Sequence, residues 1–179
     1  MGINRKEFGF QIVSKLYKSM CEKRKFSNAY SFIDRSDGAE FLLIIIAGYQ
    51  PFYWNKVFLK VNDAVQQFGK KIDVCVANPG GGGIKELENL CEQYKWSYFY
   101  LKFDRLSQAQ NQVIKLHPAA KYIFKIDEDI ILPKYYFYGM YEAYKDSYIS
   151  FGRTLGFCAP LININGYGYN VFFRFNKCT

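Results

Sequence analysis

The feature that most constrains the fold is an uninterrupted run of seven apolar residues, 41–47, which ends at Gly48. A helix that crosses a membrane needs about 20 apolar residues, so this run is too short for one. It has the length of a β-strand. An apolar run without alternation is typical of a strand that is covered on both faces in a parallel sheet. We therefore expect residues 41–47 to form a central strand with helices on both sides.

Beyond this run, short apolar segments and amphipathic segments alternate along the chain. The further strands that we expect are residues 72–77, 96–103 and 122–126. The expected helices are residues 54–68, 84–94, 107–116 and 133–144, with Ser107 as an N-cap and Pro133 in a first turn. Repeated strand–helix–strand units imply right-handed crossovers. The sequence therefore predicts an α/β fold, a three-layer α/β/α sandwich with a mostly parallel central sheet.

The segments on either side of this core have different patterns. Residues 1–40 carry a helical pattern followed by a turn signal, so we expect a helix and turn packed on the core. The apolar residues of that helix are Phe8, Ile12, Leu16 and Met20. Residues 147–179 are rich in Asn, Gly and Tyr and predict turns, with a strand near residues 169–175. The core itself comprises residues 41–146.

The composition narrows the classes of function. The net charge of +8 divides into +3 for residues 1–40 and +5 for the remainder, so neither part is a nucleic-acid-binding arm. A spread positive charge suits an anionic small ligand, a phosphate-bearing substrate or an acidic membrane surface. The five cysteines form no CxxC pair, which favours reduced thiols over a zinc site, and the single histidine excludes chemistry that needs two. Without a signal-peptide core, the chain is expected to be cytoplasmic, or peripheral at the inner face of the membrane.

Polar or glycine-rich residues follow each of the four expected strands. They are residues 48–50, residues 78–83, Asp104 with Arg105, and residues 127–129. The carboxyl ends of parallel strands meet at one edge of a sheet, and ligands of such sheets bind there. The sequence therefore predicts one shared ligand site at that edge.

The acidic triplet Asp127-Glu128-Asp129 comes directly after the last expected strand. Residues two apart in an extended chain point the same way, so Asp127 and Asp129 are predicted to face one metal ion with Glu128 turned aside. A hard divalent cation held by one or two carboxylates and substrate phosphates is typical of Mg²⁺. The alternative is a solvated acidic turn before Pro133. We favour the metal site because three acids between apolar flanks are costly to bury without a counter-ion.

Other residues at this edge admit two interpretations. Tyr49 either stacks on a nucleobase or packs on the helix below it. Asn78 is a candidate for hydrogen-bonding a nucleobase. The glycine-rich residues 79–83 either offer backbone amides to an anion or form a mobile turn. Asn111 is either a ligand contact or an ordinary surface residue, and His117, before Pro118 at a helix end, is expected to be structural.

Together these residues resemble the nucleotide-sugar-binding, Rossmann-like half of GT-A-type glycosyltransferases, and most closely the bacterial family-2-like enzymes that build surface polysaccharides. The resemblance rests on the strands that end at Tyr49 and Asn78, on the helix start at residues 107–111 and on the triplet, and it spans roughly residues 41–146. In that family the triplet, a DxD motif, binds a divalent ion that bridges the diphosphate of a nucleotide-sugar. Gln110 stands where the family usually has Arg, and Asn78 where it often has Asp or Glu against uracil.

The resemblance implies a metal-dependent glycosyltransferase that moves a sugar from a nucleotide-sugar, with a UDP-sugar favoured, to a glycan or lipid-linked acceptor. It makes Asp127 a ribose-side or metal-side acid and Asp129 a direct ligand of Mn²⁺ or Mg²⁺. The other donor contacts that it implies are Gly48, Tyr49, Asn78, Gln110 and Asn111. The family continues well past its triplet with an acceptor-binding part that carries the catalytic base. Residues 147–179 lie largely outside the resemblance and are expected to be the start of an incomplete acceptor-side region, so we expect a truncated enzyme that binds donor better than it transfers sugar.

No catalytic base is assigned from the sequence, and two further classes of function stay open. After the triplet, only Glu142 and Asp146 are acidic. A sugar-phosphate nucleotidyltransferase on a similar sheet would need a glycine-rich basic loop where this chain has residues 48–51. A non-catalytic module that binds nucleic acid or an anionic membrane surface would gather its Lys and Arg on one face, whereas only residues 23–25 are clustered. No nucleic-acid partner is expected.

Overall fold

The computed structural model describes residues 13–16, 30–102, 105–151, 162–164 and 167–169. The chain divides into two compact units, Met1–Tyr30 and Ser31–Thr179. Residues 13–16 of the first unit are helical, as the sequence predicts, but Phe8, Ile12 and Met20 lie outside the described residues. The packing of this helix on the core therefore stays a prediction.

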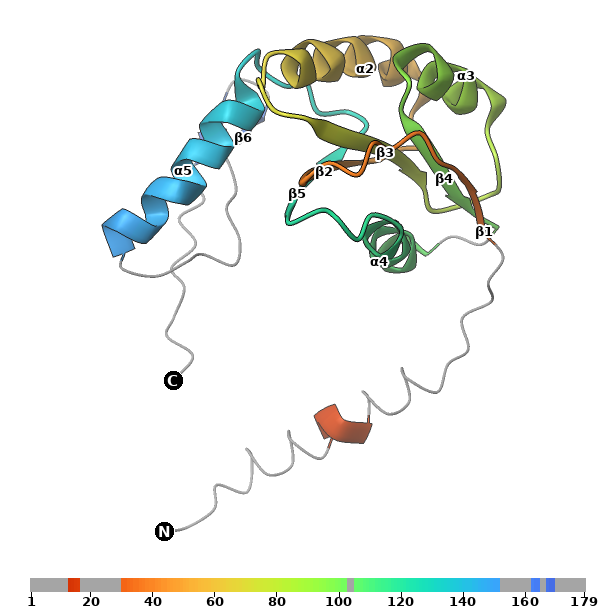
Figure 1. The fold of residues 1–179 in the computed structure, drawn as a ribbon. Helices are drawn as coiled ribbons and strands as arrows, with labels where there is room; N and C mark the ends of the chain where they lie inside the picture. Colours follow the sequence, from red (N-terminus) through yellow and green to blue (C-terminus); the bar gives the residue numbers. More distant parts are fainter. Residues whose placement is uncertain (1–12, 17–29, 103–104, 152–161, 165–166, 170–179) are drawn as a thin grey trace. The chain divides into compact units, whose positions relative to one another are not determined.

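The second unit is built on a five-stranded, mostly parallel sheet (Figure 1). In chain order the strands are β1 (Tyr30–Ile33), β2 (Phe41–Ile46), β3 (Ile72–Asn78), β4 (Ser97–Leu101) and β5 (Tyr122–Asp127). The helices are α2 (Pro51–Gln66), α3 (Lys85–Tyr94), α4 (Leu106–Leu116) and α5 (Tyr136–Phe151). A separate antiparallel pair is formed by β6 (Ile162–Ile164) and β7 (Tyr167–Tyr169). The predicted α/β alternation is thus confirmed.

Several boundaries differ from the sequence-based expectation. Strand β1 was not predicted, and α5 begins at Tyr136 and continues to Phe151, past the expected end at residue 144. Helix α4 begins at Leu106 with Arg105 in the N-cap position, so the prediction of Ser107 as N-cap is wrong. The reason is a backbone contact from a distant loop, because the N–H of Arg105 donates to the carbonyl of Pro79 and fixes the turn before the helix.

Strand β2 is buried on both faces, as its apolar run predicts. Phe41, Leu43 and Ile45 belong to one hydrophobic cluster, and the alternate residues of β2 belong to another. The first cluster includes the inward faces of α2 and α3, and the second includes that of α4. Figure 1 accordingly shows α2 and α3 over one face of the sheet and α4 over the other. This alternation follows from the two-residue period of a strand.

The edge strand β5 is covered on one face only. Tyr122, Phe124 and Ile126 face the cluster shared with α2, whereas Ile123 and Lys125 are exposed on the other face. The described helices therefore leave part of the second face of the sheet open. Helices on both sides of a mostly parallel sheet are established, and the complete three-layer sandwich remains a prediction.

The strand order places a topological switch point between β2 and β5. The order in the sheet is β1-β4-β3-β2-β5, with parallel pairing from β4 through to β5. From β2 the chain therefore proceeds outward through β3 and β4, then returns to the opposite side of β2 as β5. Ligands of open parallel sheets bind outside the carboxyl ends of the strands at such a point.

Candidate functional site

A cavity of about 300 Å³ lies at this switch point. The register pairs Ile46 of β2 with Asp127 of β5, which brings the loops after these two strands together. The residues that line the cavity are Ile46, Tyr49, Gln50, Leu106, Asp127, Glu128 and Asp129. They come from the end of β2, the start of α4 and the acidic triplet, so three of the four loops expected to converge contribute side chains or backbone.

Within the triplet, Glu128 points inward and its neighbours point outward. Its side chain is 3% exposed, while Asp127 and Asp129 are both exposed. The expectation that Glu128 is turned aside agrees with this exposure pattern, but the cause differs from the one predicted. Glu128 and Asp129 lie in a turn after β5, closed by a hydrogen bond from the N–H of Ile130 to the carbonyl of Asp127, and not in extended chain. The carboxylate of Glu128 accepts hydrogen bonds from the N–H of Gly48 (2.8 Å) and of Tyr49 (2.9 Å) and from Nε1 of Trp54. The central acid therefore joins the end of β5 to the loop after β2 and to α2.

The loop after β2 can take this course only with glycine at position 48. Gly48 has φ of +138°, and a Cβ there would lie 2.6 Å from Oδ1 of Asn78. Asn78 is 1% exposed. Its Nδ2 donates to the carbonyl of Gly82 (2.9 Å), and its Oδ1 accepts from the N–H of Gly80 (3.0 Å). The amide that we considered for nucleobase recognition thus holds the glycine-rich loop against Gly48.

The glycine-rich loop is fixed at further points. The N–H of Gly82 donates to the carbonyl of Leu101, and a Cβ on Gly83 would lie 3.1 Å from the ring of Tyr100. The helix that follows, α3, carries Glu86 and Glu88 in its first turn. Acidic side chains there repel an anion from the helix N-terminus. In this structure the loop packs against β4, and its geometry does not favour the anion site considered above.

The two exposed acids are the residues that could hold a metal ion. Oδ1 of Asp127 forms an ion pair with Nζ of Lys125 at 2.6 Å, and both side chains are partly exposed. Carboxylate oxygens suit Mg²⁺ and Mn²⁺, which commonly keep water and substrate phosphates as their other ligands. Within the described part of the chain, no group of three or more His, Cys, Asp or Glu could hold a metal ion. Two exposed carboxylates, those of Asp127 and Asp129, are what the triplet offers to a divalent ion.

Of the other predicted donor contacts, only Tyr49 is among the residues that line the cavity. Tyr49 is 54% exposed, so part of its side chain is accessible at the cavity. Gln110 is half-buried and Asn111 exposed on α4, and neither lines the cavity. Gln50 was expected in the loop at this edge but was given no ligand role, and Leu106 was not predicted at the site, since an apolar residue carries no signal for one.

Apart from Glu128, the buried titratable groups His117, Cys75 and Cys91 do not line the cavity. His117 is buried beneath the ring of Phe32, and its Nδ1 lies 2.8 Å from the carbonyl oxygen of Val113. Both described cysteines are free thiols. Burial raises the pKa of Cys75 well above its usual value and that of Cys91 to about 12. These two thiols are therefore protonated and unreactive in the folded chain.

Comparison of the sequence with models of known protein families finds no match, and comparison with curated proteins finds none. In the residues that the structure describes, none of the helices has the length and apolarity needed to cross a membrane.

Proposed function

We propose that this chain binds a nucleotide-sugar, with a UDP-sugar favoured, at the cavity between β2 and β5, and that it acts as a metal-dependent glycosyltransferase with a GT-A-type three-layer fold. The observation that carries the proposal is the pair of exposed carboxylates, Asp127 and Asp129, at the switch point of a parallel sheet beside a cavity of about 300 Å³. Ligands of open parallel sheets bind at such switch points, outside the carboxyl ends of the strands. The acceptor would be a glycan or a lipid-linked glycan.

In this proposal, three of the side chains that line the cavity contact the metal ion or the nucleotide. Asp127 and Asp129 would hold Mn²⁺ or Mg²⁺, and the ion would neutralise the leaving nucleoside diphosphate. Tyr49 offers an aromatic face on which a nucleobase can stack. Lys125 serves as the counter-ion of Asp127 in the structure, so a divalent ion would compete with this lysine for the carboxylate.

Donor binding has stronger support than sugar transfer. Transfer to a hydroxyl with inversion needs a carboxylate that removes the acceptor proton. Glu142, on α5, pairs with Lys145 at 2.7 Å on the same helix, and it does not line the cavity. Asp146 is exposed on the same helix and does not line the cavity either. We assign no base among the described residues, so the binding step is the one that the first experiment addresses.

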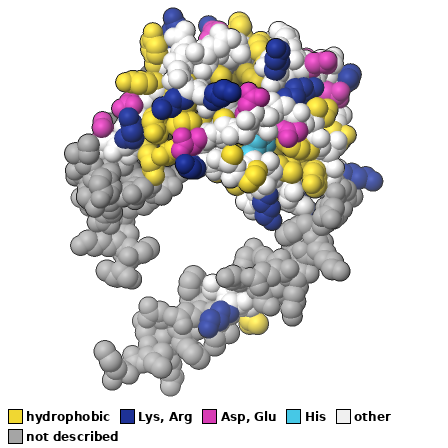
Figure 2. All heavy atoms as spheres, in the orientation of Figure 1, with side chains coloured by type: hydrophobic (Ala, Val, Ile, Leu, Met, Phe, Trp, Pro, Cys, Tyr) yellow, Lys and Arg dark blue, Asp and Glu magenta, His cyan; other side chains and the backbone are white. Residues whose placement is uncertain are grey.

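A peripheral contact with an anionic membrane surface is the second candidate. Phe52, in the first turn of α2 beside the cavity-lining Gln50, is 89% exposed. An apolar ring exposed to this extent, with Lys56 one turn further along α2, suits the interface of a lipid layer. A nucleic-acid module is less well supported, because Figure 2 shows basic and acidic side chains interspersed over the face in view.

Thermal unfolding with nucleoside diphosphates, in the presence and absence of Mn²⁺, tests the proposal. We expect UDP to raise the melting temperature only when Mn²⁺ is present, and Asp129→Asn to remove this shift while the variant stays folded. Asp63→Asn is the control, because Asp63 is a partly exposed aspartate that pairs with Lys60, as Asp127 pairs with Lys125, but it lies near the far end of α2. An absent shift with UDP, together with a clear shift with RNA or anionic vesicles, would favour the non-catalytic alternatives.

A further inference from the structure

We propose that Glu128 is the positioning residue of the cavity, and that ligand affinity depends on its carboxylate although all the bonds of that carboxylate are made within the protein. This inference rests on the proposed function, since the ligand used to test it is UDP with Mn²⁺. It assigns different tasks to the three acids of the triplet. Asp127 and Asp129 face the ligand, and Glu128 holds the loop after β2, whose residues Tyr49 and Gln50 also line the cavity.

The hydrogen bonds to Glu128 begin where the bonding of β2 to its neighbours ends. The last such bond runs from the N–H of Ala47 to the carbonyl of Ala77. The next two N–H groups, those of Gly48 and Tyr49, donate to Oε2 and Oε1 of Glu128. Buried backbone N–H groups need an acceptor. Glu128, directly after the neighbouring strand β5, supplies the acceptor for both N–H groups and thereby turns the loop towards β5.

The same carboxylate also holds the start of α2. Oε2 accepts a second hydrogen bond from Nε1 of Trp54, whose side chain is buried in the first turns of that helix. The first turn of α2 has no acidic residue of its own, so Glu128 is also the negative group beside its positive end. The loop that carries Tyr49 and Gln50 is thus held at both ends by one side chain, and both of these residues line the cavity.

The chemistry of the three donors makes glutamine a poor replacement despite its equal size. All three partners of Glu128 are N–H groups, so both oxygens must accept. An amide side chain has one accepting oxygen and one donating NH₂ group. In Glu128→Gln, the NH₂ group would face either Tyr49 alone or the pair of Gly48 and Trp54. At least one buried N–H would lose its acceptor, and the loop would be released on that side.

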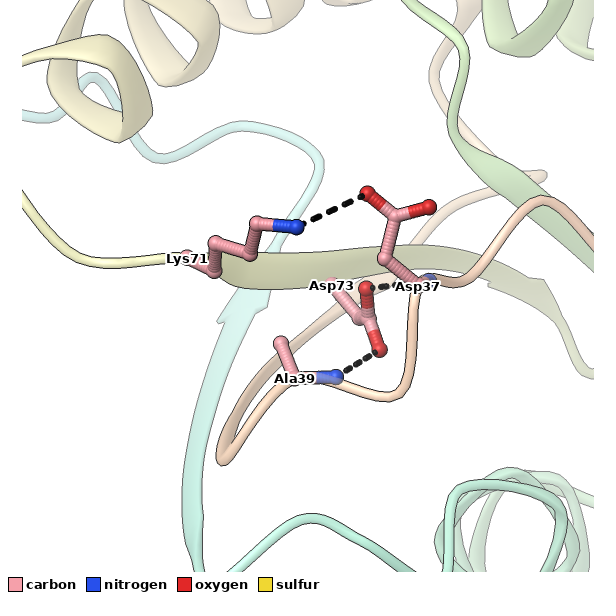
Figure 3. Close-up of polar contacts among 4 residues, drawn as sticks. All are labelled: Asp37, Ala39, Lys71 and Asp73. Carbon is pink, nitrogen blue, oxygen red and sulfur yellow. Dashed lines mark hydrogen bonds and ion pairs between the residues drawn. The ribbon is translucent and has the colours of Figure 1, made fainter.

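Asp73 provides a matched control at the opposite end of β2 (Figure 3). Its carboxylate is 7% exposed and accepts from the N–H groups of Asp37 (2.9 Å) and Ala39 (2.8 Å). Asp73→Asn is therefore the same chemical change, a buried carboxylate made into an amide against backbone donors. It differs in that none of the residues involved lines the cavity.

The experiment measures backbone and indole hydrogen exchange and the affinity for UDP with Mn²⁺ in the parent chain and both variants. Since hydrogen bonds to a charged acceptor are worth about tenfold or more in an equilibrium, we expect Glu128→Gln to speed exchange at Gly48 and Tyr49 and to weaken binding by about tenfold. We expect Asp73→Asn to speed hydrogen exchange at Asp37 and Ala39. The affinity for UDP with Mn²⁺ should stay within about twofold of the parent value, because this substitution lowers only the free energy of unfolding.

Two outcomes would overturn the role of Glu128. One is parent-like affinity in Glu128→Gln with faster exchange at the loop, and the other is an equal loss of affinity in Asp73→Asn. If the parent chain itself does not bind UDP with Mn²⁺, the proposed function fails first, which is a distinct result. Should Glu128→Gln not fold, Trp54→Phe removes one donor and keeps the carboxylate. It should still weaken binding, by about threefold for a single donor, and parent-like binding in Trp54→Phe would overturn the proposal.

Discussion

At each end of β2, one buried carboxylate accepts hydrogen bonds from two backbone N–H groups of a loop, but the surroundings of the two loops differ. At the amino end, Asp73 of β3 accepts two backbone N–H groups from the loop that leads into the strand (Figure 3). At the carboxyl end, Glu128 accepts two from the loop that leaves it. The amino end is completed by a surface ion pair between Asp37 and Lys71, at 3.9 Å, whereas the carboxyl end opens into a cavity flanked by two exposed acids.

This difference shows that a buried carboxylate at a strand end does not by itself mark a functional site. Both acids satisfy backbone donors that the sheet leaves unpaired. What distinguishes Glu128 is its place at the switch point between β2 and β5, where two loops diverge and leave room for a ligand. The loop at the amino end of β2 is thus a closed turn, whereas the loop at its carboxyl end forms part of the lining of a cavity.

The largest expected effect on stability is at the glycines that flank β2. In Gly48→Ala, the new Cβ would meet Oδ1 of Asn78 at 2.6 Å, and the backbone would keep φ near +138°. Strain and overpacking each cost about 1–3 kcal/mol, so we expect the free energy of unfolding to fall by about 3 kcal/mol. Gly38→Ala is the control at the amino end, where φ is +72° and a Cβ would meet no atom. Its expected cost is about 1 kcal/mol.

Urea unfolding of both glycine variants gives the measurement. Equal losses at the two positions would mean that the close approach of Gly48 to Asn78 does not constrain the loop.

The second effect concerns Asp73. Conversion of this buried carboxylate to an amide leaves at least one of its two backbone donors unsatisfied, so Asp73→Asn is expected to lower the free energy of unfolding by about 2 kcal/mol. Chemical denaturation followed by circular dichroism measures it. A loss below about 0.5 kcal/mol would show that water replaces the carboxylate at this end, and the similarity between the two ends of β2 would be lost.

The third effect decides between the two roles considered for Asn78. Because its amide is used by Gly80 and Gly82, we expect Asn78→Ala to lower stability by about 1–2 kcal/mol and to leave the preference among nucleobases unchanged. Competition between UDP and GDP in the presence of Mn²⁺ measures that preference. A changed base preference with parent-like stability would show that Asn78 contacts the nucleobase and does not mainly hold the loop.

The smallest effect is at the surface ion pair of the amino end. Lys71 and Asp37 are 81% and 75% exposed in their side chains, and exposed pairs contribute little. We expect Lys71→Ala to change the free energy of unfolding by less than about 0.5 kcal/mol. A larger loss in the same denaturation assay would mean that the amino end depends on charge pairing as well as on Asp73.

The sequence is informative where a pattern is local. The apolar run of β2 predicted a strand buried on both faces, which the structure confirms. For the triplet, the sequence predicted Glu128 turned aside from Asp127 and Asp129, but neither its burial nor the turn that replaces the extended chain. Strand β1 escaped prediction because four residues, Tyr30–Ile33, are too few to establish a period.

The partners of Glu128 could not be predicted, since they depend on long-range geometry. Trp54 lies 74 positions away in the sequence, and no local signal links the two residues. Likewise, nothing in the composition of residues 78–83 indicates that Asn78 bonds the loop and not a ligand, because the close approach of Gly48 exists only in the folded sheet.

The central claim is that the ligand binds at the carboxyl end of β2, and paramagnetic broadening by Mn²⁺ tests it most directly. At roughly 3.3 Å per residue, the six residues of β2 span about 20 Å, so one spectrum of the ¹⁵N-labelled chain can distinguish the two ends. With UDP and Mn²⁺, the account predicts strong broadening at Tyr49, Gln50 and residues 127–129, sharp signals at Asp37 and Ala39, and loss of the effect in Asp129→Asn. Broadening centred on Asp37 and Asp73, or no localised broadening at all, would contradict it.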